Sequence, residues 1–343
     1  MLSYLLEVAI KLNHRPMYLP EFSSHSRFLV TGGTGFIGIW LLDALLKLND
    51  SHRLECKFTV LTRDPSRFLS NHPTIANHQS VSLLAGDVVT VNLQEEYFDY
   101  LIHGAAVSAF WDDPGNYFET IVMGTRNVMY WAKRNKVAKI LFLSSGAIYG
   151  EPTHDLEQFD ETTLSAPEIG TPGAVYGESK RCAEMLVHLL GSDHADVTIA
   201  RLFSFFGPLM PIKSHFAFSQ FMSCAVKDED IIVDNPEACR SYMYVENVAE
   251  SLSKLLKKNN NHQIYNIGGD VRVTMLELAK IIAKETGSSS KVIARQSENV
   301  NKARSIYLPK VSRFLSEFDL EGKISLEQGI KLTRQWFRGG QHT

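Results

Sequence analysis

One short segment, Thr31–Gly38, constrains this chain more than any other. It reads Thr-Gly-Gly-Thr-Gly-Phe-Ile-Gly, follows the apolar run Arg27–Thr31 and leads into the apolar helical pattern of Phe36–Leu48. Glycine tolerates backbone conformations that cost other residues energy, and its lack of a side chain lets a ligand approach the main chain. The free amides at a helix start also attract anions. A glycine triplet between a strand and a helix therefore predicts a pyrophosphate site of the kind found in dinucleotide-binding domains.

The first half of the chain alternates short β-branched runs with helical patterns. Such alternation is typical of an α/β protein with a Rossmann-type, doubly wound parallel sheet, and we expect that fold class here. The predicted strands are 27–31, 57–62, 81–85, 100–103, 139–144 and 196–202, and the predicted helices are 36–48, 117–134 and 175–190.

Beyond residue 203 the pattern becomes irregular, and Gly207, Pro208 and Pro211 interrupt it. We expect residues 27–203 to form the dinucleotide-binding Rossmann domain. Residues 204–343 are expected to form mostly a smaller C-terminal α/β substrate-binding lobe, with segments of it completing the sheet. Ligands of such sheets bind at the carboxyl ends of the strands, so the site is predicted in a cleft between sheet and lobe. In this part the predicted strands are 231–233 and 263–267, and the predicted helices are 245–257, 274–286 and 325–337.

Composition argues against several classes of protein. The formal net charge of −3 lacks the basic excess of a nucleic-acid-binding protein. The 4 cysteines have no CxxC spacing, and the 12 histidines show no ligand spacing with cysteine or carboxylate. Neither a metal site nor a disulfide framework is therefore expected.

Residues 1–26 are expected to form an N-terminal extension. Their apolar stretch is interrupted by Glu7 and Lys11, is too short to span a bilayer and lacks the small-residue cleavage site of a signal peptide. The pattern favours a short amphipathic helix that packs on the protein or on a neighbouring subunit, with contact to a membrane surface as the alternative. We therefore expect a cytoplasmic protein without a membrane span.

Three polar residues point to acid–base chemistry beside a hydride transfer. Ser145 follows the predicted strand 139–144, while Tyr176 and Lys180 stand four residues apart on one face of the predicted helix 175–190. A free tyrosine has a pKa of about 10, and a neighbouring ammonium lowers that pKa by favouring the phenolate. Tyr176 is thus predicted to exchange a proton with the reacting oxygen, which Ser145 orients. Lys180 is also expected to hold the ribose of a nicotinamide cofactor.

The residue at the end of the second strand indicates whether the cofactor's ribose has a free 2′-hydroxyl, as in NAD, or a 2′-phosphate, as in NADP. An acidic residue there would bind a free 2′-hydroxyl, but Thr62 stands at this position and Arg63 follows. An arginine pairs well with a 2′-phosphate, so NADP is favoured over NAD. In the alternative interpretation, Arg63 is a solvated surface residue and Asp64 merely caps the next helix.

With these motifs the chain resembles the extended short-chain dehydrogenase/reductase family, which comprises nucleotide-sugar epimerases, dehydratases and reductases. The resemblance covers about residues 27–338. It rests on the glycine loop, on Ser145, Tyr176 and Lys180, and on Gly86-Asp87-Val88, His103-Gly104-Ala105-Ala106, Gly124-Thr125-Arg126-Asn127-Val128, Arg201-Leu202-Phe203, Phe206-Gly207-Pro208, Arg240-Ser241-Tyr242-Met243-Tyr244-Val245 and Tyr265-Asn266-Ile267-Gly268.

The resemblance implies a ligand, an assembly and a set of binding residues. The implied substrate is a nucleotide-diphosphate sugar, and the implied assembly is a homodimer formed by the helices 117–134 and 175–190. The predicted substrate-binding residues are Ser145, Tyr176, Ser204, His215, Phe216 and Arg240, with Arg240 on the diphosphate. The predicted cofactor-binding residues are Gly32, Gly35, Phe36, Ile37, Gly38, Arg63, Asp87, Val88, Ala105, Ala106, Lys180 and Phe203.

Departures from the family pattern narrow the reaction. The 4,6-dehydratases place Asp-Glu directly after the catalytic serine or threonine, whereas Gly146 and Ala147 stand here and neither moves a proton. We therefore expect hydride transfer at a sugar carbon, C4 in the first instance. An epimerase and an NADPH-dependent 4-keto reductase both fit, and Arg63 slightly favours the reductase. A nucleotide-sugar 4,6-dehydratase, a reductase of a non-sugar carbonyl and a non-catalytic dinucleotide-binding protein are the alternatives.

Overall fold

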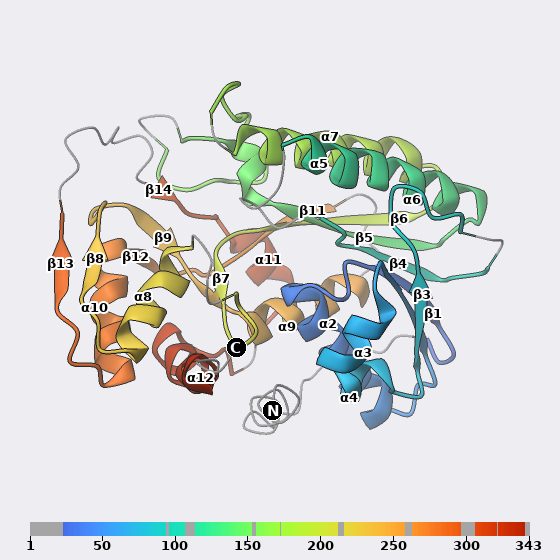
Figure 1. The fold of residues 1–343 in the computed structure, drawn as a ribbon. Coiled ribbons are helices and arrows are strands. Elements are labelled where there is room, and N and C mark those ends of the chain that lie inside the picture. Colours follow the sequence, from blue (N-terminus) through green and yellow to red (C-terminus); the bar gives the residue numbers. More distant parts are fainter. Residues whose placement is uncertain are drawn as a thin grey trace.

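A sheet of 7 parallel strands forms the centre of the larger part of the molecule, in the order β11-β6-β5-β4-β1-β2-β3 (Figure 1). The computed structural model describes residues 23–93, 96–106, 114–152, 156–171, 173–211, 216–257, 263–295, 306–320 and 322–339. The strands are β1 (Arg27–Thr31), β2 (Lys57–Thr62), β3 (Val81–Ala85), β4 (Tyr100–His103), β5 (Lys139–Ser145), β6 (Asp196–Leu202) and β11 (Gln263–Ile267).

The strand order confirms the predicted doubly wound α/β fold. From β1 the chain moves outward to β2 and β3, then returns to the other side of β1 to form β4. The carboxyl ends of β1 and β4 therefore lie next to each other where the winding reverses. In open α/β sheets this reversal opens the crevice in which ligands bind.

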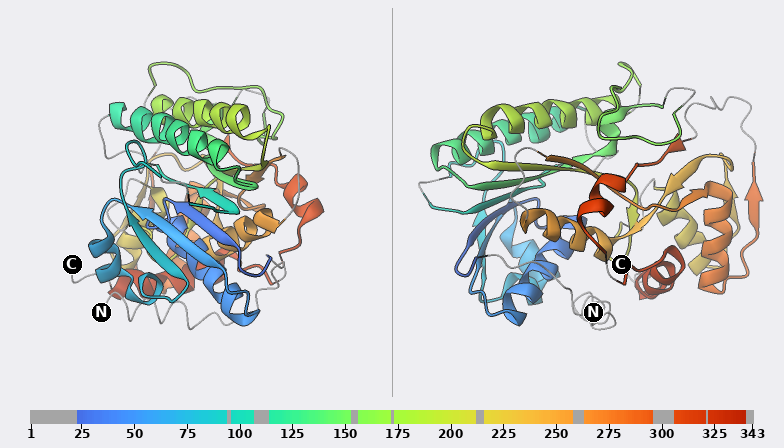
Figure 2. Two further views of the ribbon diagram at one scale, coloured as in Figure 1. Left: turned by 90° about the vertical axis from the view of Figure 1, so that its right-hand side faces the viewer. Right: turned by 180° about the vertical axis from the view of Figure 1, so that it is seen from behind.

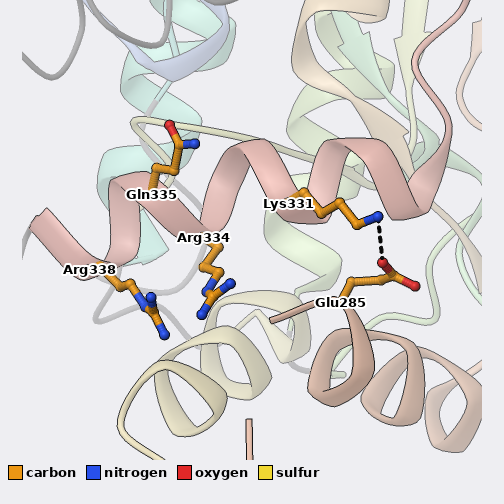
Figure 3. Close-up of a pocket in the computed structure, with 5 residues that line it drawn as sticks. All are labelled: Glu285, Lys331, Arg334, Gln335 and Arg338. Atoms are coloured by element: carbon orange, nitrogen blue, oxygen red, sulfur yellow. Dashed lines mark ion pairs between the residues drawn. The ribbon is translucent and has the colours of Figure 1, made fainter. Parts of the chain in front are cut away.

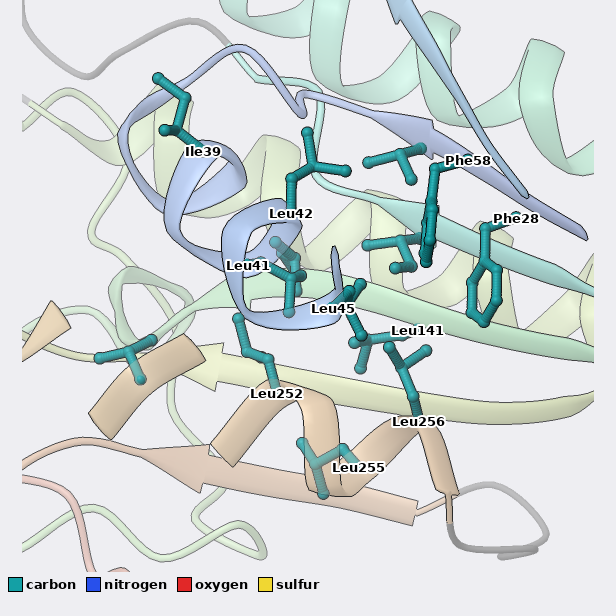
Figure 4. Packing of buried hydrophobic residues seen from close by; sticks show 14 of the residues in the cluster. Phe28, Ile39, Leu41, Leu42, Leu45, Phe58, Leu141, Leu252, Leu255 and Leu256 are labelled. Atoms are coloured by element: carbon teal, nitrogen blue, oxygen red, sulfur yellow. The ribbon is translucent and has the colours of Figure 1, made fainter. Parts of the chain in front are cut away.

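The two faces of the sheet bury separate cores, because side chains alternate along each strand. Phe28 and Val30 of β1 belong to one core, and Leu29 between them belongs to the other. Figure 4 shows the first core, in which α2 (Phe36–Ser51) packs against the sheet and against α9 (Val245–Lys257). Helices α6 (Gly124–Arg134) and α7 (Ala174–Gly191) lie side by side over the second core (Figure 2).

Two segments after residue 203 are part of this larger unit. Strand β11 pairs with β6 along its whole length and extends the sheet by one strand. Leu252, Leu255 and Leu256 of α9 are completely or almost completely buried in the first core. Strand β11 thus completes the sheet from the C-terminal part of the chain. The apolar face of α9 is covered by α2 and the strands.

The remaining C-terminal elements surround a third core (Figure 2). Helices α8 (Ala217–Val226), α10 (Met275–Thr286) and α12 (Leu326–Gly339) contribute most of its apolar side chains. The short strands in this part are β7 (Phe205–Phe206), β8 (Ile231–Val233), β9 (Cys239–Ser241), β10 (Met243–Tyr244), β12 (Arg272–Thr274), β13 (Val292–Ala294) and β14 (Ile306–Tyr307).

The predicted helix over 117–134 is helical along its whole length, but one part of it is not a regular α-helix. The structure has α5 (Pro114–Tyr117), a π-helical stretch η1 (Phe118–Met123) and then α6. The Thr125 hydroxyl donates to the Ile121 carbonyl, a bond that competes with the main-chain ladder at this point. Such π turns are frequent at functional sites, and this one packs against α7, the helix that carries Tyr176 and Lys180.

Several short helices escaped the sequence analysis, since they contain too few residues for a periodic pattern. They are α3 (Pro65–Asn71), α4 (Pro73–Ala76), the 3-10 turn η2 (Gly146–Tyr149) and α11 (Ser312–Glu317). Among the residues that the structure describes, none of the helices combines the length and the apolar character needed to cross a membrane.

Candidate active site

The glycine loop lies directly against the end of β4. Gly32 has a φ of +72°, and a Cβ atom at this residue would lie 2.4 Å from the carbonyl carbon of Gly104. No side chain fits between the two backbones, so the close approach of β1 and β4 at the reversal of winding requires glycine at position 32.

The N-terminus of α2 has the features of an anion site. Gly35 is the N-cap residue, no side chain caps this helix end, and its first turn contains no acidic residue. The first amides of a helix have no partner within the helix. Those of Phe36, Ile37 and Gly38 thus remain available to a phosphate group, and the loop fits the pyrophosphate of a dinucleotide.

A buried hydrogen-bonded chain fixes the end of β4. The Thr125 hydroxyl donates to the Ile121 carbonyl, so it accepts from His103 Nε2 over 2.9 Å. His103 Nδ1 then accepts from the Thr31 hydroxyl over 2.6 Å, and Thr31 Oγ1 accepts from the Ala105 amide over 3.2 Å. Burial, aided by the charge of Lys180, lowers the pKa of His103 to about 3. The imidazole is therefore neutral, and its two hydrogen bonds hold Thr31, whose hydroxyl oxygen binds the Ala105 amide.

The segment around Asp87 and Val88, two of the predicted cofactor-binding residues, is held by α6. Asp87 Oδ1 accepts from the Val89 amide over 2.8 Å, which fixes the turn after β3. Asn127 Nδ2 donates to the carbonyls of Val88 and Val91 over 3.0 Å each. Gly124 lies against Val88, where an added Cβ would come within 2.7 Å of the valine side chain.

Arg63 lies at the end of β2 and is exposed, while Thr62 before it is buried. Asp64 accepts from the Arg67 amide over 2.9 Å and caps α3, as the alternative interpretation expected. Arg63 forms no ion pair with any residue that the structure describes. Its guanidinium thus stands in solvent at the carboxyl end of β2.

Ser145 and Tyr176 meet at the carboxyl end of β5. Ser145 Oγ accepts from the Ala147 amide over 3.1 Å, and the Ser145 hydroxyl lies close enough to the Tyr176 phenol to lower the pKa of that phenol. Helix α7 can approach η2 this closely because residue 177 is glycine, whose Cβ would lie 2.5 Å from the Ala147 carbonyl oxygen. A larger residue at 177 would therefore push Tyr176 away from Ser145.

Tyr176 is half-buried, and the pKa of its phenol is raised above the usual value. Burial raises its pKa, the hydrogen bond from Ser145 lowers it, and the nearby Tyr117 phenol raises it. The rings of Tyr117 and Tyr176 are edge to face, with centroids 6.1 Å apart. Positive charge near the phenol is needed for it to act as a base at neutral pH.

Lys180 lies one turn farther along α7 and is almost completely buried. Its Nζ donates to the Leu143 carbonyl over 2.8 Å and lies 5.1 Å from the centre of the Phe142 ring. Burial lowers the pKa of Lys180 to about 8, against the charge of Glu184, which raises it. The amine therefore remains mostly protonated at neutral pH.

A buried ion pair lies beneath this lysine. Arg201 of β6 donates from Nε and Nη2 to the two carboxylate oxygens of Glu184, over 3.0 and 2.8 Å. The Ser144 hydroxyl donates to the same carboxylate. Arg201 Nη1 also donates to the Tyr149 hydroxyl over 2.8 Å, and Tyr149 donates to Asn266 Oδ1 over 2.9 Å. The pair thus joins α7, β5, β6, η2 and β11.

Of the remaining predicted substrate residues, the structure describes Arg240, Ser204 and Phe216. Arg240 lies on β9 with its guanidinium carbon 5.6 Å from the centre of the Tyr307 ring, and Tyr307 lies close to Ser145. Ser204 is half-buried beside Phe203, and its carbonyl accepts from the Met243 amide. Phe216 is 45% exposed at the start of α8. His215 lies outside the described residues.

Comparisons with known proteins decide the family. The model of the NAD dependent epimerase/dehydratase family matches residues 28–268. The chain belongs to this family. It is 30% identical over 321 residues to UDP-glucuronic acid decarboxylase 6 of Arabidopsis thaliana, covering 92% of this chain and 90% of the relative.

Solved structures of epimerases share the fold. The UDP-glucuronic acid 4-epimerase of Bacillus cereus, in complex with UDP-glucuronic acid and NAD, has a TM-score of 0.77 at 21% identity, covering 91% of this chain and 99% of the other. The UDP-N-acetylglucosamine 4-epimerase of Methanobrevibacter ruminantium M1 has a TM-score of 0.77 at 21% identity, covering 93% and 99%. The resemblance drawn from the sequence motifs is confirmed.

Three residues near the site of this epimerase/dehydratase family member were not foreseen. Glu184 had a signal, since it follows Lys180 by four residues and therefore shares its helix face. For Tyr117 and Tyr307 the sequence contained no signal that pointed to the site. Tyr307 lies on a strand of two residues, and its place depends on pairing with β9.

A separate surface pocket lies between α10 and α12 in the C-terminal lobe. Figure 3 shows its lining, in which Lys331 pairs with Glu285 over 3.1 Å and Arg334, Gln335 and Arg338 complete the wall. None of these residues belongs to the predicted catalytic or binding set, so the predicted chemistry is confined to the sheet ends and the loops around them.

We expect Glu184→Gln to destabilise the protein by about 3–5 kcal/mol, because the Arg201 cation would remain buried without its carboxylate. Urea unfolding followed by circular dichroism measures this change. Glu178→Gln on the same helix is the matched control, since its ion pair with Arg181 is exposed and is worth about 0–1 kcal/mol. Equal losses in the two variants would contradict a structural role for the buried pair.

Proposed function

We propose that this protein oxidises and re-reduces C4 of a nucleotide-diphosphate sugar and thereby inverts that carbon, as a 4-epimerase. The observation that supports the proposal best is the meeting of Ser145, Tyr176 and buried Lys180 at the carboxyl end of β5, beside the reversal of the sheet. A nicotinamide dinucleotide, when bound, supplies the acceptor and donor of hydride at the sugar carbon.

In this proposal the protein's own residues move the proton. Tyr176 takes the proton of the sugar hydroxyl during oxidation and returns it during reduction. Ser145 holds the reacting oxygen against Tyr176. The Lys180 ammonium supplies the positive charge that favours the phenolate, and its fixed bond to the Leu143 carbonyl keeps it in place.

The proposed ligand contacts follow the two sides of the cleft. The amides of Phe36, Ile37 and Gly38 would hold the pyrophosphate of the dinucleotide, and Gly32 and Gly35, which have no side chains, would let it approach the loop. Asp87 and Val88 would contact its adenosine, and Ala105, Ala106, Lys180 and Phe203 its nicotinamide half. Arg240 would bind the diphosphate of the sugar nucleotide, with Ser204, His215 and Phe216 as further substrate contacts.

The absence of a proton carrier after Ser145 favours inversion over elimination. Gly146 and Ala147 offer no acid or base for removing water, which argues against a 4,6-dehydratase. Inversion needs no further acid or base. It needs only that the keto sugar rotates between the two hydride transfers.

Decarboxylation is the second candidate, and the Arabidopsis relative favours it. A sugar with a carboxylate at C5 becomes a β-keto acid once C4 is oxidised, and such acids lose carbon dioxide without a dedicated base. The same Ser145, Tyr176 and Lys180 would then support the subsequent reduction. The 4-keto reductase predicted from the sequence is the third candidate. It would start from a 4-keto sugar and reduce it with NADPH, without first oxidising a sugar alcohol.

We also propose a homodimer formed through η1, α6 and α7. Phe118, Tyr130, Met185 and Leu189 on these neighbouring helices are 51%, 46%, 71% and 66% exposed. Exposed apolar side chains gathered on adjacent helices are typical of an interface. Sedimentation of the purified chain tests the assembly.

We expect Tyr176→Phe to reduce turnover by about 10²–10⁴-fold, because it removes the proton carrier while keeping the ring. Turnover is measured by chromatography of products from UDP-glucose, UDP-N-acetylglucosamine and UDP-glucuronic acid. Tyr97→Phe, in an exposed residue distant from the site, is the matched control.

The product identifies the branch of the proposal. A C4 epimer supports the epimerase, release of carbon dioxide from UDP-glucuronic acid supports the decarboxylase, and turnover only with a 4-keto sugar and NADPH supports the reductase. Full turnover in Tyr176→Phe would contradict the proposed role of Tyr176, whereas wild-type protein that binds the dinucleotide but turns over none of these substrates would favour a non-catalytic dinucleotide-binding protein.

The NADP preference stays a prediction that depends on Arg63, since the B. cereus 4-epimerase was solved with NAD. We expect Arg63→Ala to weaken NADPH binding about 10–100-fold by removing a charge-assisted contact to the 2′-phosphate, and to leave NADH binding unchanged. Fluorescence titration measures both affinities, with Arg67→Ala on α3 as control. Wild-type protein that binds NADH as tightly as NADPH would contradict the preference.

A further inference from the structure

The surface pocket between α10 and α12 has a lining of charged and polar side chains (Figure 3). Its volume is about 420 Å³, which is within the range of small-molecule sites. Such sites are usually lined by apolar and aromatic side chains, whereas none of the residues that line this pocket is apolar. A ligand here would therefore be held by charge and hydrogen bonds.

Three cations of the lining occupy one face of α12. Lys331, Arg334 and Arg338 follow one another at intervals of three and four residues, which places them in a row along a helix. Figure 3 shows Arg334 and Arg338 pointing to the same side of α12, while Gln335 points to the other. Like charges at this spacing repel each other, so an anion bound between them would stabilise the row.

The pocket contains one carboxylate for these three cations. Glu285 of α10 pairs with Lys331 over 3.1 Å, and its other oxygen lies 3.7 Å from the ammonium of Lys284. Neither Arg334 nor Arg338 forms an ion pair or a side-chain hydrogen bond within the described part of the chain. Three positive charges and one negative charge thus line the pocket, which leaves a net charge of +2.

The guanidinium of Arg334 has no anionic partner from the protein. Its Nε is shut off from solvent and has no hydrogen-bond partner among the described residues. The terminal Nη groups are not buried in this way, so they are the part of the guanidinium that is open to a ligand. A guanidinium presents parallel donors to a phosphate group, and Arg338 offers a second set one turn farther along α12.

The ends of the neighbouring helices do not account for the two arginines. Cations near a helix C-terminus often bond its last carbonyls. At the end of α10, however, the amides of Gly287 and Ser288 already donate to carbonyls of the last turn. At the end of α8, the amides of Lys227 and Glu229 both donate to the Cys224 carbonyl. The arginines are therefore not needed as caps.

The nearby acid Asp228, which follows α8, is occupied by other partners. Its Oδ1 accepts from the Ser289 amide over 2.8 Å and from the Ser288 hydroxyl over 2.9 Å. These bonds lower the pKa of Asp228 most, and the charge of Arg338 makes the smallest contribution. No ion pair joins Arg338 to Asp228, so this carboxylate does not take the place of an anion in the pocket.

We propose that this pocket is a second anion site, which binds a phosphate-bearing small molecule through Arg334 and Arg338. Phosphate oxygens would accept from the open Nη groups of both arginines. Lys331 would add a third contact when the anion draws it away from Glu285. The pocket would bind its anion whether or not Tyr176 is a base.

The proposed anion site is separate from the catalytic cleft. Strand β12, which leads into α10, pairs with β9 so that Val273 lies opposite Arg240, the predicted contact of the substrate diphosphate. Glu285 lies in the last turn of the same helix. A helix of 12 residues is about 18 Å long, so the two anion contacts lie at opposite ends of α10.

Calorimetric titration of the whole protein with inorganic pyrophosphate tests the site. NAD and UDP in excess keep pyrophosphate out of the cleft, and the salt concentration is fixed because salt screens such contacts. We expect one pyrophosphate per chain. The double variant Arg334→Gln, Arg338→Gln should weaken this binding about 10–100-fold, since charge-assisted hydrogen bonds are lost.

A titration with ADP distinguishes the two sources of such a ligand. ADP bound as tightly as pyrophosphate would assign the pocket to phosphate esters, and weaker binding would assign it to the free inorganic anion. In both cases the same double variant should weaken the binding.

The double variant Lys280→Gln, Lys291→Gln is the matched control, because it removes the same charge from exposed residues of the same lobe outside the pocket. It should leave pyrophosphate binding unchanged. Glu285→Gln changes the pocket in the opposite direction. It frees Lys331 and removes the carboxylate of the lining, so it should tighten pyrophosphate binding several-fold.

The outcomes separate this inference from the proposed function. A folded Arg334→Gln, Arg338→Gln protein that binds pyrophosphate as tightly as the wild type overturns the site, and so does wild-type protein that binds none beside NAD and UDP. An equal loss in the lysine control also overturns it, since overall charge would then explain the binding. If the arginine variant does not fold, Glu285→Gln protein that binds no more tightly than the wild type overturns the site in its place. Tyr176→Phe should bind pyrophosphate as the wild type does, whatever its turnover.

Discussion

The buried ion pair between Glu184 and Arg201 connects the parts that the site needs. Glu184 belongs to the helix that carries Tyr176 and Lys180, and Arg201 belongs to the strand that leads into Phe203 and Ser204. Such a pair adds little net free energy over apolar packing, because both charges lose their hydration. Its effect is instead on geometry, since the two parallel hydrogen bonds of the guanidinium allow only one arrangement of α7 against β6.

The electrostatics of the site follow from this arrangement. The helix presents one buried cation, Lys180, whose charge Glu184 supports from the next turn. The imidazole of His103 is neutral in the same region, so it adds no second positive charge. Tyr176 thus lies one turn along its helix from this cation, beside Ser145 and edge to face with the ring of Tyr117. This is the environment that a tyrosine base requires.

The sequence predicted the sheet well because each strand is a β-branched run bounded by glycine or polar residues. The strand bounds at 27–31, 57–62, 81–85, 100–103 and 196–202 are those of the structure, and the 139–144 strand is one residue longer. Tyr176 and Lys180 were found by their spacing on a predicted helix and Ser145 by its place after a predicted strand, with the glycine loop as context, and the structure brings them together. Tyr307 could not be found, since a two-residue strand has no periodicity and its position depends on contacts from both lobes. The π turn before α6 lies within a continuous helical pattern and was equally hidden.

The central claim is that the protein removes hydride from C4 of a sugar nucleotide and returns it to the same molecule. A substrate labelled with deuterium at C4, converted in ordinary water, tests it most directly, with mass spectrometry of the product. The account predicts that the product keeps the deuterium and that labelled substrate reacts more slowly than unlabelled. A product in which the deuterium has been replaced by hydrogen from water would contradict the account.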